Sequence, residues 1–302
     1  MLRQVSALFQ AGRRSGAVVR VARVTRTIYT TVRIDDDIFV IDKNTGSRVS
    51  GWHDIKLFPS GDHSNISSPS SIFTDAEEYL PTLQCVIETP RGSINPLQLG
   101  THTEMNPLQF QKKGQLDEGD TDLQKGTKRS YASKIPFNAG ILPQTWSSPE
   151  VMDRGYPGSG RPLEVIEIGT KRLSSGQVVT VAPLGMIGAL QNGRINWKML
   201  VINSRDHVQD PLYSIEDVDV RFPRLLGDIR EWLRMCLVHE NLPRYTFAFD
   251  EDWQDWGFGM EIIGECHKDW KVLLGLEPPQ STAQKDQGSS APNLHRRPWI
   301  PK

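Results

Sequence analysis

Strand-forming runs come before helical patterns in this chain, and that order restricts its fold more than any other feature. Short β-branched runs bounded by Gly, Pro or Asn occupy 84–88, 163–168, 177–182 and 198–202. Apolar residues then recur at helical spacing in 224–238 and 257–274, and Gly275 is a suitable end for the second helix. Strands followed by helices predict an α+β domain, a closed barrel with helices packed on one side.

The two ends and one internal stretch differ in composition from the rest of the chain. Residues 1–34 contain seven Arg and no Asp, Glu or Lys, which is typical of a mitochondrial targeting segment; a disordered basic arm is the alternative. The Ser- and Pro-rich stretch 59–81 predicts a surface insertion within a domain that spans 35–275. The Pro-rich segment 276–302 predicts a disordered tail, although its basic and aromatic end is also suited to be a short docking peptide.

Charge and cysteine content exclude several classes of protein. The formal net charge is −1, so the chain as a whole has no strong attraction to nucleic acid or membranes. The sequence contains no run of about 20 apolar residues, so no membrane-spanning helix is predicted. Cys85, Cys236 and Cys266 lack the spacing of a zinc site and are odd in number, so we expect buried thiols and no disulfide framework.

Nine segments, in one order, resemble the soluble, eukaryotic-type (family I) inorganic pyrophosphatases. They are SGWHDI (50–55), VIETPR (86–91), NPL (106–108), GILPQTW (140–146), PLEVIEIG (162–169), NWK (196–198), SIEDV (214–218), FAF (247–249) and HKDWK (267–271). The resemblance implies an OB-like five-stranded β-barrel with two main helices packed on it. It also implies descent from hydrolases that split pyrophosphate into two phosphates with Mg²⁺, and it leaves a homodimer open.

Such hydrolysis needs clustered carboxylates to hold Mg²⁺ and basic groups to hold phosphate oxygens. The family signature Asp-x-Asp-Pro-x-Asp stands here as 159–164, in which Ser159 and Arg161 replace the first two acids and Glu164 keeps the third charge. An arginine about 5 Å from Mg²⁺ is repelled by about 7 kcal/mol at an effective dielectric of about 20, which is on the order of five decades of metal affinity.

Further positions that align with the family's pocket have also changed. The replaced positions are Pro96, Gln98, Ala139, Ser159, Arg161, Gln191, Asn196, Cys236 and Leu237, and the retained ones are Glu88, Glu164 and Lys198. Glu164 is at most a weak metal ligand by itself, and an amide such as Asn196 is a poor one. We therefore predict a pseudoenzyme with a degenerate magnesium site, without a sufficient catalytic set and without a metal cofactor.

Alternatives remain open at this stage. The acids Asp117, Glu118, Asp120 and Asp122 could supply carboxylates that the alignment does not place in the pocket. Arg161 could pair with Glu88 or Glu164, or form with Lys198 a metal-free site for phosphate or a nucleotide.

The preferred hypothesis is an impaired pyrophosphatase homologue in the mitochondrial matrix that acts as a structural or interaction subunit. An active Mg²⁺-dependent mitochondrial pyrophosphatase and a phosphate- or nucleotide-binding module are the other two hypotheses. Protein partners are expected at the tails and at a basic loop, which also suits RNA contact within a ribonucleoprotein. The basic loop, read as a solvated face, contains Lys112, Lys113, Lys125, Lys128, Arg129 and Lys134.

Overall fold

The computed structural model describes residues 28–59, 81–113, 126–206, 212–278 and 298–301. Most of the predicted targeting segment, of the surface insertion and of the C-terminal tail therefore lies outside the described residues. The acidic stretch that contains Asp117 to Asp122 lies outside them as well.

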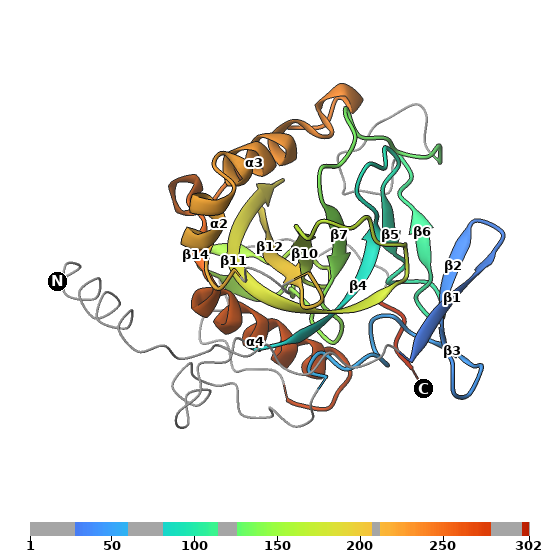
Figure 1. Cartoon of the computed structure of the whole chain (residues 1–302). Helices are drawn as coiled ribbons and strands as arrows, with labels where there is room; N and C mark the ends of the chain where they lie inside the picture. The colour runs from blue at the N-terminus through green and yellow to red at the C-terminus, as the bar shows by residue number, and fades with distance from the viewer. Residues whose placement is uncertain (1–27, 60–80, 114–125, 207–211, 279–297, 302) are drawn as a thin grey trace.

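Five strands close into a barrel, as the resemblance implied (Figure 1). They are β4 (Leu83–Thr89), β7 (Asn138–Ile141), β10 (Glu164–Glu167), β11 (Val178–Gln191) and β12 (Arg194–Asn203). The strands follow one another in the order β12-β10-β7-β4-β11, and β11 pairs back onto β12. Because the first and last strands meet, the barrel has no open edge along this path. Two short strands, β13 (Thr246–Phe247) and β14 (Gln254–Asp255), add to β11.

The hairpin of β11 and β12 is longer than the runs 177–182 and 198–202 predicted. Asn192 and Gly193 link the strands with φ of 50° and 73°, the left-handed pair of a type I′ turn that matches strand twist. A Cβ at position 188 would lie only 2.8 Å from the Trp197 ring, so glycine fits there. This glycine interrupts the run of β-branched residues that would mark a strand in the sequence. Close packing therefore extends the hairpin through residues that the sequence pattern left out.

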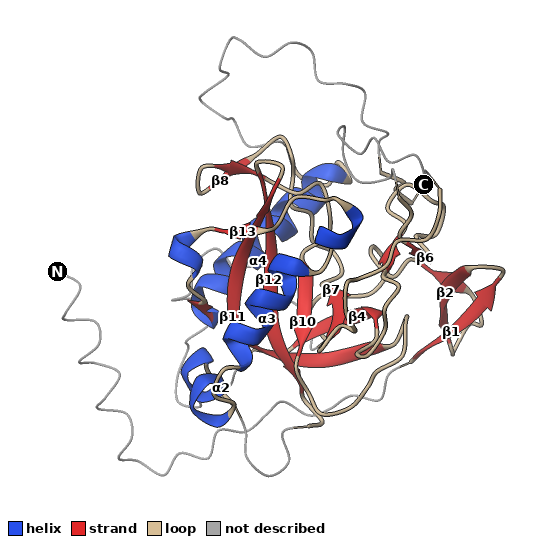
Figure 2. Cartoon of the chain, turned by 90° about the horizontal axis from the view of Figure 1, so that it is seen from above, coloured by secondary structure: helices blue, strands red, loops and turns tan. Residues whose placement is uncertain are grey.

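A second sheet lies beside the barrel (Figure 2). Its strand order is β1 (Tyr29–Ile34), β2 (Asp37–Asp42), β6 (Leu108–Phe110) and β5 (Leu97–Leu99), and β3 (Arg48–Val49) pairs with β2. Strands β2 and β3 form a hairpin around Asn44-Thr45-Gly46. Strand β1 corrects the prediction for residues 29–34, which their composition had assigned to the N-terminal arm, because backbone pairing with β2 holds them. A small hairpin of β8 (Met152–Asp153) and β9 (Tyr156–Pro157) forms a separate two-stranded sheet that packs against β12.

The helices are α2 (Ile215–Arg221), α3 (Leu225–Met235) and α4 (Trp256–Leu273), with short 3₁₀ turns η3 (Val238–Glu240) and η4 (Phe249–Glu251). The bounds of α3 and α4 confirm the two predicted helices. Helix α2 was missed, although Ser214 caps it by accepting a hydrogen bond from the Asp217 amide. Both α2 and α4 pack against β11. No helix in the described ranges has the length and apolar composition that a bilayer crossing requires.

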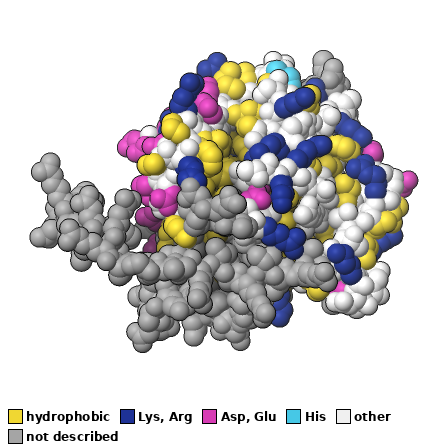
Figure 3. Space-filling view, viewed as in Figure 1, with side chains coloured by type: hydrophobic (Ala, Val, Ile, Leu, Met, Phe, Trp, Pro, Cys, Tyr) yellow, Lys and Arg dark blue, Asp and Glu magenta, His cyan; other side chains and the backbone are white. Residues whose placement is uncertain are grey.

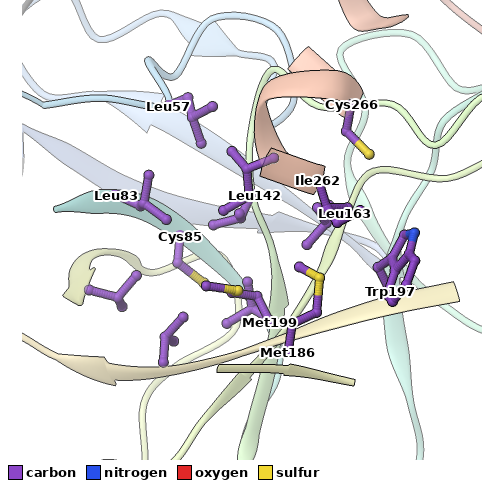
Figure 4. Packing of buried hydrophobic residues seen from close by; sticks show 14 of the residues in the cluster. Leu57, Leu83, Cys85, Leu142, Leu163, Met186, Trp197, Met199, Ile262 and Cys266 are labelled. Carbon is purple, nitrogen blue, oxygen red and sulfur yellow. The ribbon is translucent and has the colours of Figure 1, made fainter. Parts of the chain in front are cut away.

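Apolar side chains fill the barrel and the layer beneath α4 (Figure 4). Met186 and Met199 face each other across the β11–β12 pair, and Ile262 of α4 belongs to the same fully buried cluster. Flexible methionine side chains fill irregular space between a sheet and a helix well. This packing fixes α4 to the barrel.

Two valines of α2 provide a matched test of this core. Val218 is fully buried, whereas Val220 is 82% exposed. We expect Val218→Ala to lower the free energy of unfolding by about 2 kcal/mol, because two methyl groups leave the core and a cavity remains.

Val220→Ala is the control and should change that free energy by about 0.5 kcal/mol or less. Urea unfolding followed by circular dichroism measures both. Equal losses from the two variants would contradict the packing of α2 on β11.

Candidate functional site

A pocket opens between α3 and the strands β7, β10 and β12. The empty space in it, open solvent at its mouth included, is about 950 Å³. Ten of the residues singled out from the sequence line it: Gln98, Ala139, Ser159, Arg161, Glu164, Gln191, Asn196, Lys198, Cys236 and Leu237. On the face shown in Figure 3, Lys and Arg side chains are spread over the middle, whereas most Asp and Glu side chains lie at the left side. The structure thus brings together positions from five separate parts of the chain.

Arg161 lies between the two retained carboxylates. Its guanidinium is 3.8 Å from Glu164 Oε1 and 4.0 Å from Glu88 Oε1. It also donates a hydrogen bond of 2.7 Å to Gln98 Oε1. The hypothesis that Arg161 pairs with these acids is therefore confirmed.

The register of β10 and β12 places Lys198, the third retained residue, beside the Glu164 carboxylate. Glu164 of β10 stands opposite Lys198 of the parallel neighbour β12. Lys198 Nζ donates to Glu164 Oε2, and Asn196 Nδ2 donates to Glu164 Oε1 at 3.0 Å. Both oxygens of Glu164 are occupied by donors from this chain.

The pKa values of Glu88 and Glu164 shift in opposite directions in these surroundings. Burial raises the pKa of Glu88 to about 7, and the charge of Arg161 only partly opposes that rise. Burial also disfavours the charge on Glu164, but Lys198 and Arg161 outweigh it and lower its pKa to about 2. At neutral pH the pocket therefore contains one firmly ionised acid, one partly protonated acid and the cations that face them.

These residues do not fit a Mg²⁺ cluster. The described ranges contain no group of three or more His, Cys, Asp or Glu side chains arranged to hold a metal. The cationic groups of Arg161 and Lys198 instead lie against the carboxylate oxygens that an ion would need. A metal at Glu164 would have to displace both Lys198 and Asn196.

An aromatic wall forms the other side of the pocket and was missed from the sequence. Trp232 of α3 makes edge-to-face contacts with Tyr131 and Phe137. Its ring centroid lies 4.9 Å from that of Tyr131 and 5.3 Å from that of Phe137. Tyr245 also lines the pocket, with Lys198 Nζ 5.8 Å from its ring centre. Helical spacing had indicated Trp232 only as a core residue, and no local pattern marks Tyr131 or Tyr245 as its neighbours.

A buried ion pair holds the loop that carries Tyr131. Arg129 Nη1 donates to Glu240 Oε2 at 2.8 Å, and both side chains are almost fully buried. Glu240 Oε1 accepts the Ser130 amide at 2.8 Å. The assignment of Arg129 to a solvated basic face was wrong, because this residue serves as an internal anchor; Lys112, Lys128 and Lys134 are exposed as expected.

The remaining predicted residues lie at or behind the pocket. Glu88 is buried beneath Arg161, and Pro96 is buried at the start of β5, where its carbonyl accepts the Gln111 amide at 2.9 Å. All three cysteines are free and buried, as predicted. Burial raises the pKa of the Cys236 thiol in the pocket wall to about 12, so it is unreactive at neutral pH.

Comparison with known proteins identifies similar chains. The family model described as inorganic pyrophosphatase matches residues 85–271. The inorganic pyrophosphatase of Eremothecium gossypii is 30% identical over 258 residues, covering 83% of this chain and 79% of that protein. That of Drosophila melanogaster is 30% identical over 240 residues, 77% of this chain and 63% of its own length. The mouse protein named inorganic pyrophosphatase 2, mitochondrial, is 28% identical over 287 residues, 90% of this chain and 83% of that protein.

Solved structures of inorganic pyrophosphatases are similar to this chain as well. The type I inorganic pyrophosphatase of Toxoplasma gondii superposes with a TM-score of 0.66 at 25% identity, over 81% of this chain and 98% of that one. A truncated vacuolar soluble pyrophosphatase of Trypanosoma cruzi, solved in complex with PPi, gives a TM-score of 0.67 at 26% identity, over 86% and 95%.

The opposite pKa shifts of the two carboxyls lead to a pH test. A carboxyl with a raised pKa binds its proton more tightly in the folded state, so the stability of the folded chain falls as pH rises from about 4.5 to about 7. Glu88→Gln removes this group, so the stability of the variant relative to the parent chain should increase across that interval and then level off. Urea unfolding at a series of pH values measures it.

Arg161→Gln is the opposing variant. Without the guanidinium the pKa of Glu88 rises further, so the decline in stability should continue above pH 7. Parallel pH profiles for the parent and both variants would contradict the described charge arrangement.

Proposed function

The chain belongs to the inorganic pyrophosphatase family, and from its pocket we propose that it is a catalytically impaired member acting as a structural or interaction subunit of a larger mitochondrial assembly. The observation that carries this proposal is the position of Arg161, between Glu88 and Glu164. A cation of the chain itself neutralises the carboxylates that a pyrophosphatase would need for metal ions. Efficient metal-dependent activation of water is therefore not expected.

The scaffold supports the second half of the proposal. The barrel is closed and its core is filled, while the two carboxyls at the pocket, Glu88 and Glu164, face cations of the chain. Exposed lysines at 112, 128 and 134 lie on the loops beside the pocket and are the surface we propose for a protein partner, or for RNA phosphates within a ribonucleoprotein. Retention of a stable fold without its metal ligands suits a protein that is used for its surface.

An active mitochondrial pyrophosphatase is the second candidate. The names of the similar proteins, all inorganic pyrophosphatases and one of them mitochondrial, favour it. In that case the acids at 117–122 would have to complete the site, or Lys198 and Asn196 would have to release Glu164.

A phosphate-release assay separates the candidates. We expect the full chain with pyrophosphate and Mg²⁺ or Mn²⁺ to release no phosphate above an enzyme-free blank, because paired carboxylates gather too little metal. The mouse mitochondrial relative, assayed beside it, tests the assay itself. Turnover that Lys198→Ala abolishes would establish the second candidate and defeat the proposal.

Arg161→Asp tests the cause of the impairment. It removes one positive charge and adds one negative charge beside Glu164, so Mn²⁺ should bind at least about ten-fold more tightly than to the parent chain. Calorimetric titration measures the change, and Ser159→Asn is the neutral control. Equal Mn²⁺ binding by all three chains would show that Arg161 does not limit the metal site.

The proposed location has its own test. Residues 1–34 fused to a fluorescent protein should direct it to the mitochondrial matrix, because the segment is rich in Arg and free of acids. Tagged full chain from mitochondria should sediment with an assembly much larger than a free chain or dimer. Cytosolic fluorescence, or sedimentation as a free chain, would contradict the corresponding part of the proposal.

A further inference from the structure

The C-terminal residues 298–301 return to the body of the protein, far along the chain from the end of α4. Trp299 is held on both sides of its backbone: its amide donates to the Thr101 carbonyl at 2.8 Å, and its carbonyl lies 3.1 Å from His53 Nε2. Figure 1 shows this segment, in red, beside the blue N-terminal part of the described chain. One bond to a backbone carbonyl and one to an imidazole side chain therefore anchor the tip at a single residue.

The surface that receives Trp299 is built from three separate parts of the chain. We call it the socket: the 50–54 loop, the 100–106 turn and Trp270 of α4. Ser50 Oγ donates to Asn106 Oδ1 at 2.7 Å, which joins the loop to the turn. Asn106 Nδ2 in turn donates to the carbonyl oxygens of residues 100 and 101 at 3.2 and 3.4 Å. The carbonyl that Trp299 meets is thus fixed by a side-chain network.

His53 supplies the hydrogen-bond donor of the socket that faces a peptide carbonyl. The Trp270 indole donates to His53 Nδ1 at 2.9 Å, so a neutral imidazole must carry its proton on Nε2 and donate it to the Trp299 carbonyl. Burial lowers the pKa of His53 to about 4, and the Trp299 carbonyl and the charge of Asp54 oppose that shift without cancelling it. The ring is therefore neutral at pH 7 and is set to bind a peptide carbonyl.

Aromatic contacts complete the arrangement. The His53 ring stacks on Trp52, with centroids 4.3 Å apart, and the Trp299 ring lies 6.2 Å from His53 on another side. None of the residues that form the socket lines the pocket described above. The socket is a second site, independent of whether the chain hydrolyses pyrophosphate.

We propose that the socket is a peptide-docking site for an extended segment with one tryptophan, and that its occupant is the chain's own C-terminal tip. A tethered peptide has an effective concentration of order millimolar, so modest contacts suffice to keep it bound. The tip then joins the 50–54 loop and the 100–106 turn through Trp299, and it is linked to α4 only through the His53–Trp270 hydrogen bond. A variant that loses Trp299 should leave the socket open to the same sequence supplied as a free peptide.

Binding of a fluorescein-labelled peptide with the sequence of residues 295–302 tests this in the full chain. Trp299→Ala should bind the peptide at least ten-fold more tightly than the parent chain does, because the parent's own tip occupies the socket. Ile300→Ala is the matched control, since that side chain is 40% exposed, and it should bind as weakly as the parent chain. No binding by Trp299→Ala, or equal binding by all three chains, would overturn the proposal.

Two further measurements test whether the peptide binds in the socket. Adding Trp270→Phe to Trp299→Ala removes the indole donor that orients His53, and it should weaken peptide binding about ten-fold while circular dichroism stays unchanged. In the parent chain the Trp299 amide should exchange with deuterium far more slowly than the same amide in the free peptide. Exchange at the free-peptide rate, or binding that ignores Trp270, would also overturn the proposal.

Discussion

Pairing of β12 with β10 on one edge and with β11 on the other is the constraint on which the rest of the structure depends. It closes the barrel, and its parallel register sets Glu164 opposite Lys198. A shift of one residue would turn every side chain of β12 to the other face and would separate this pair. The same closure buries Met186 and Met199 against α4, so the core and the pocket are products of one strand arrangement.

Charge in the pocket is balanced within the chain. Arg161 and Lys198 face Glu164 and Glu88, and Gln98 and Asn196 complete the hydrogen bonds of the cluster. A carboxylate buried without a partner costs several kcal/mol, so the cations of this chain stabilise Glu88 and Glu164 inside the pocket. Under the proposed function, Arg161 provides the positive charge that metal ions would otherwise supply beside these carboxylates.

Several family-like segments have structural roles in this chain that do not depend on catalysis. Ser50 and Asn106 join two loops, and Trp270 orients His53. The Trp52 indole donates to the Thr145 carbonyl at 2.8 Å, and Thr145 Oγ1 donates to the Leu142 carbonyl at 2.6 Å. These bonds do not involve the residues that line the pocket, so the motifs that supply them are needed for the fold whether or not the pocket is catalytic. They also form the surface that receives the C-terminal tip.

Local chemistry in the sequence determined the class of elements and much of their position. Apolar spacing located α3 and α4, and Gly275, with φ of 72°, ends α4 as expected. The order of nine motifs led to the barrel and identified the pocket residues, because motif matching preserves register across long separations. The resemblance had also singled out Ser159, Arg161 and Asn196 as pocket positions, and all three line the pocket.

The tertiary structure alone decided how distant residues meet. Residues 29–34 look like part of a basic arm, yet they form β1 because β2 offers a free edge. Arg129 looks like one more solvent-facing cation, yet Glu240 lies 111 residues away in sequence and reaches it inside the protein. Trp232, Tyr131 and Trp299 gain their neighbours in the same way. Composition and periodicity report what a residue prefers along its own segment, whereas burial, ion pairing and ring contacts depend on which segments closure of the barrel brings together.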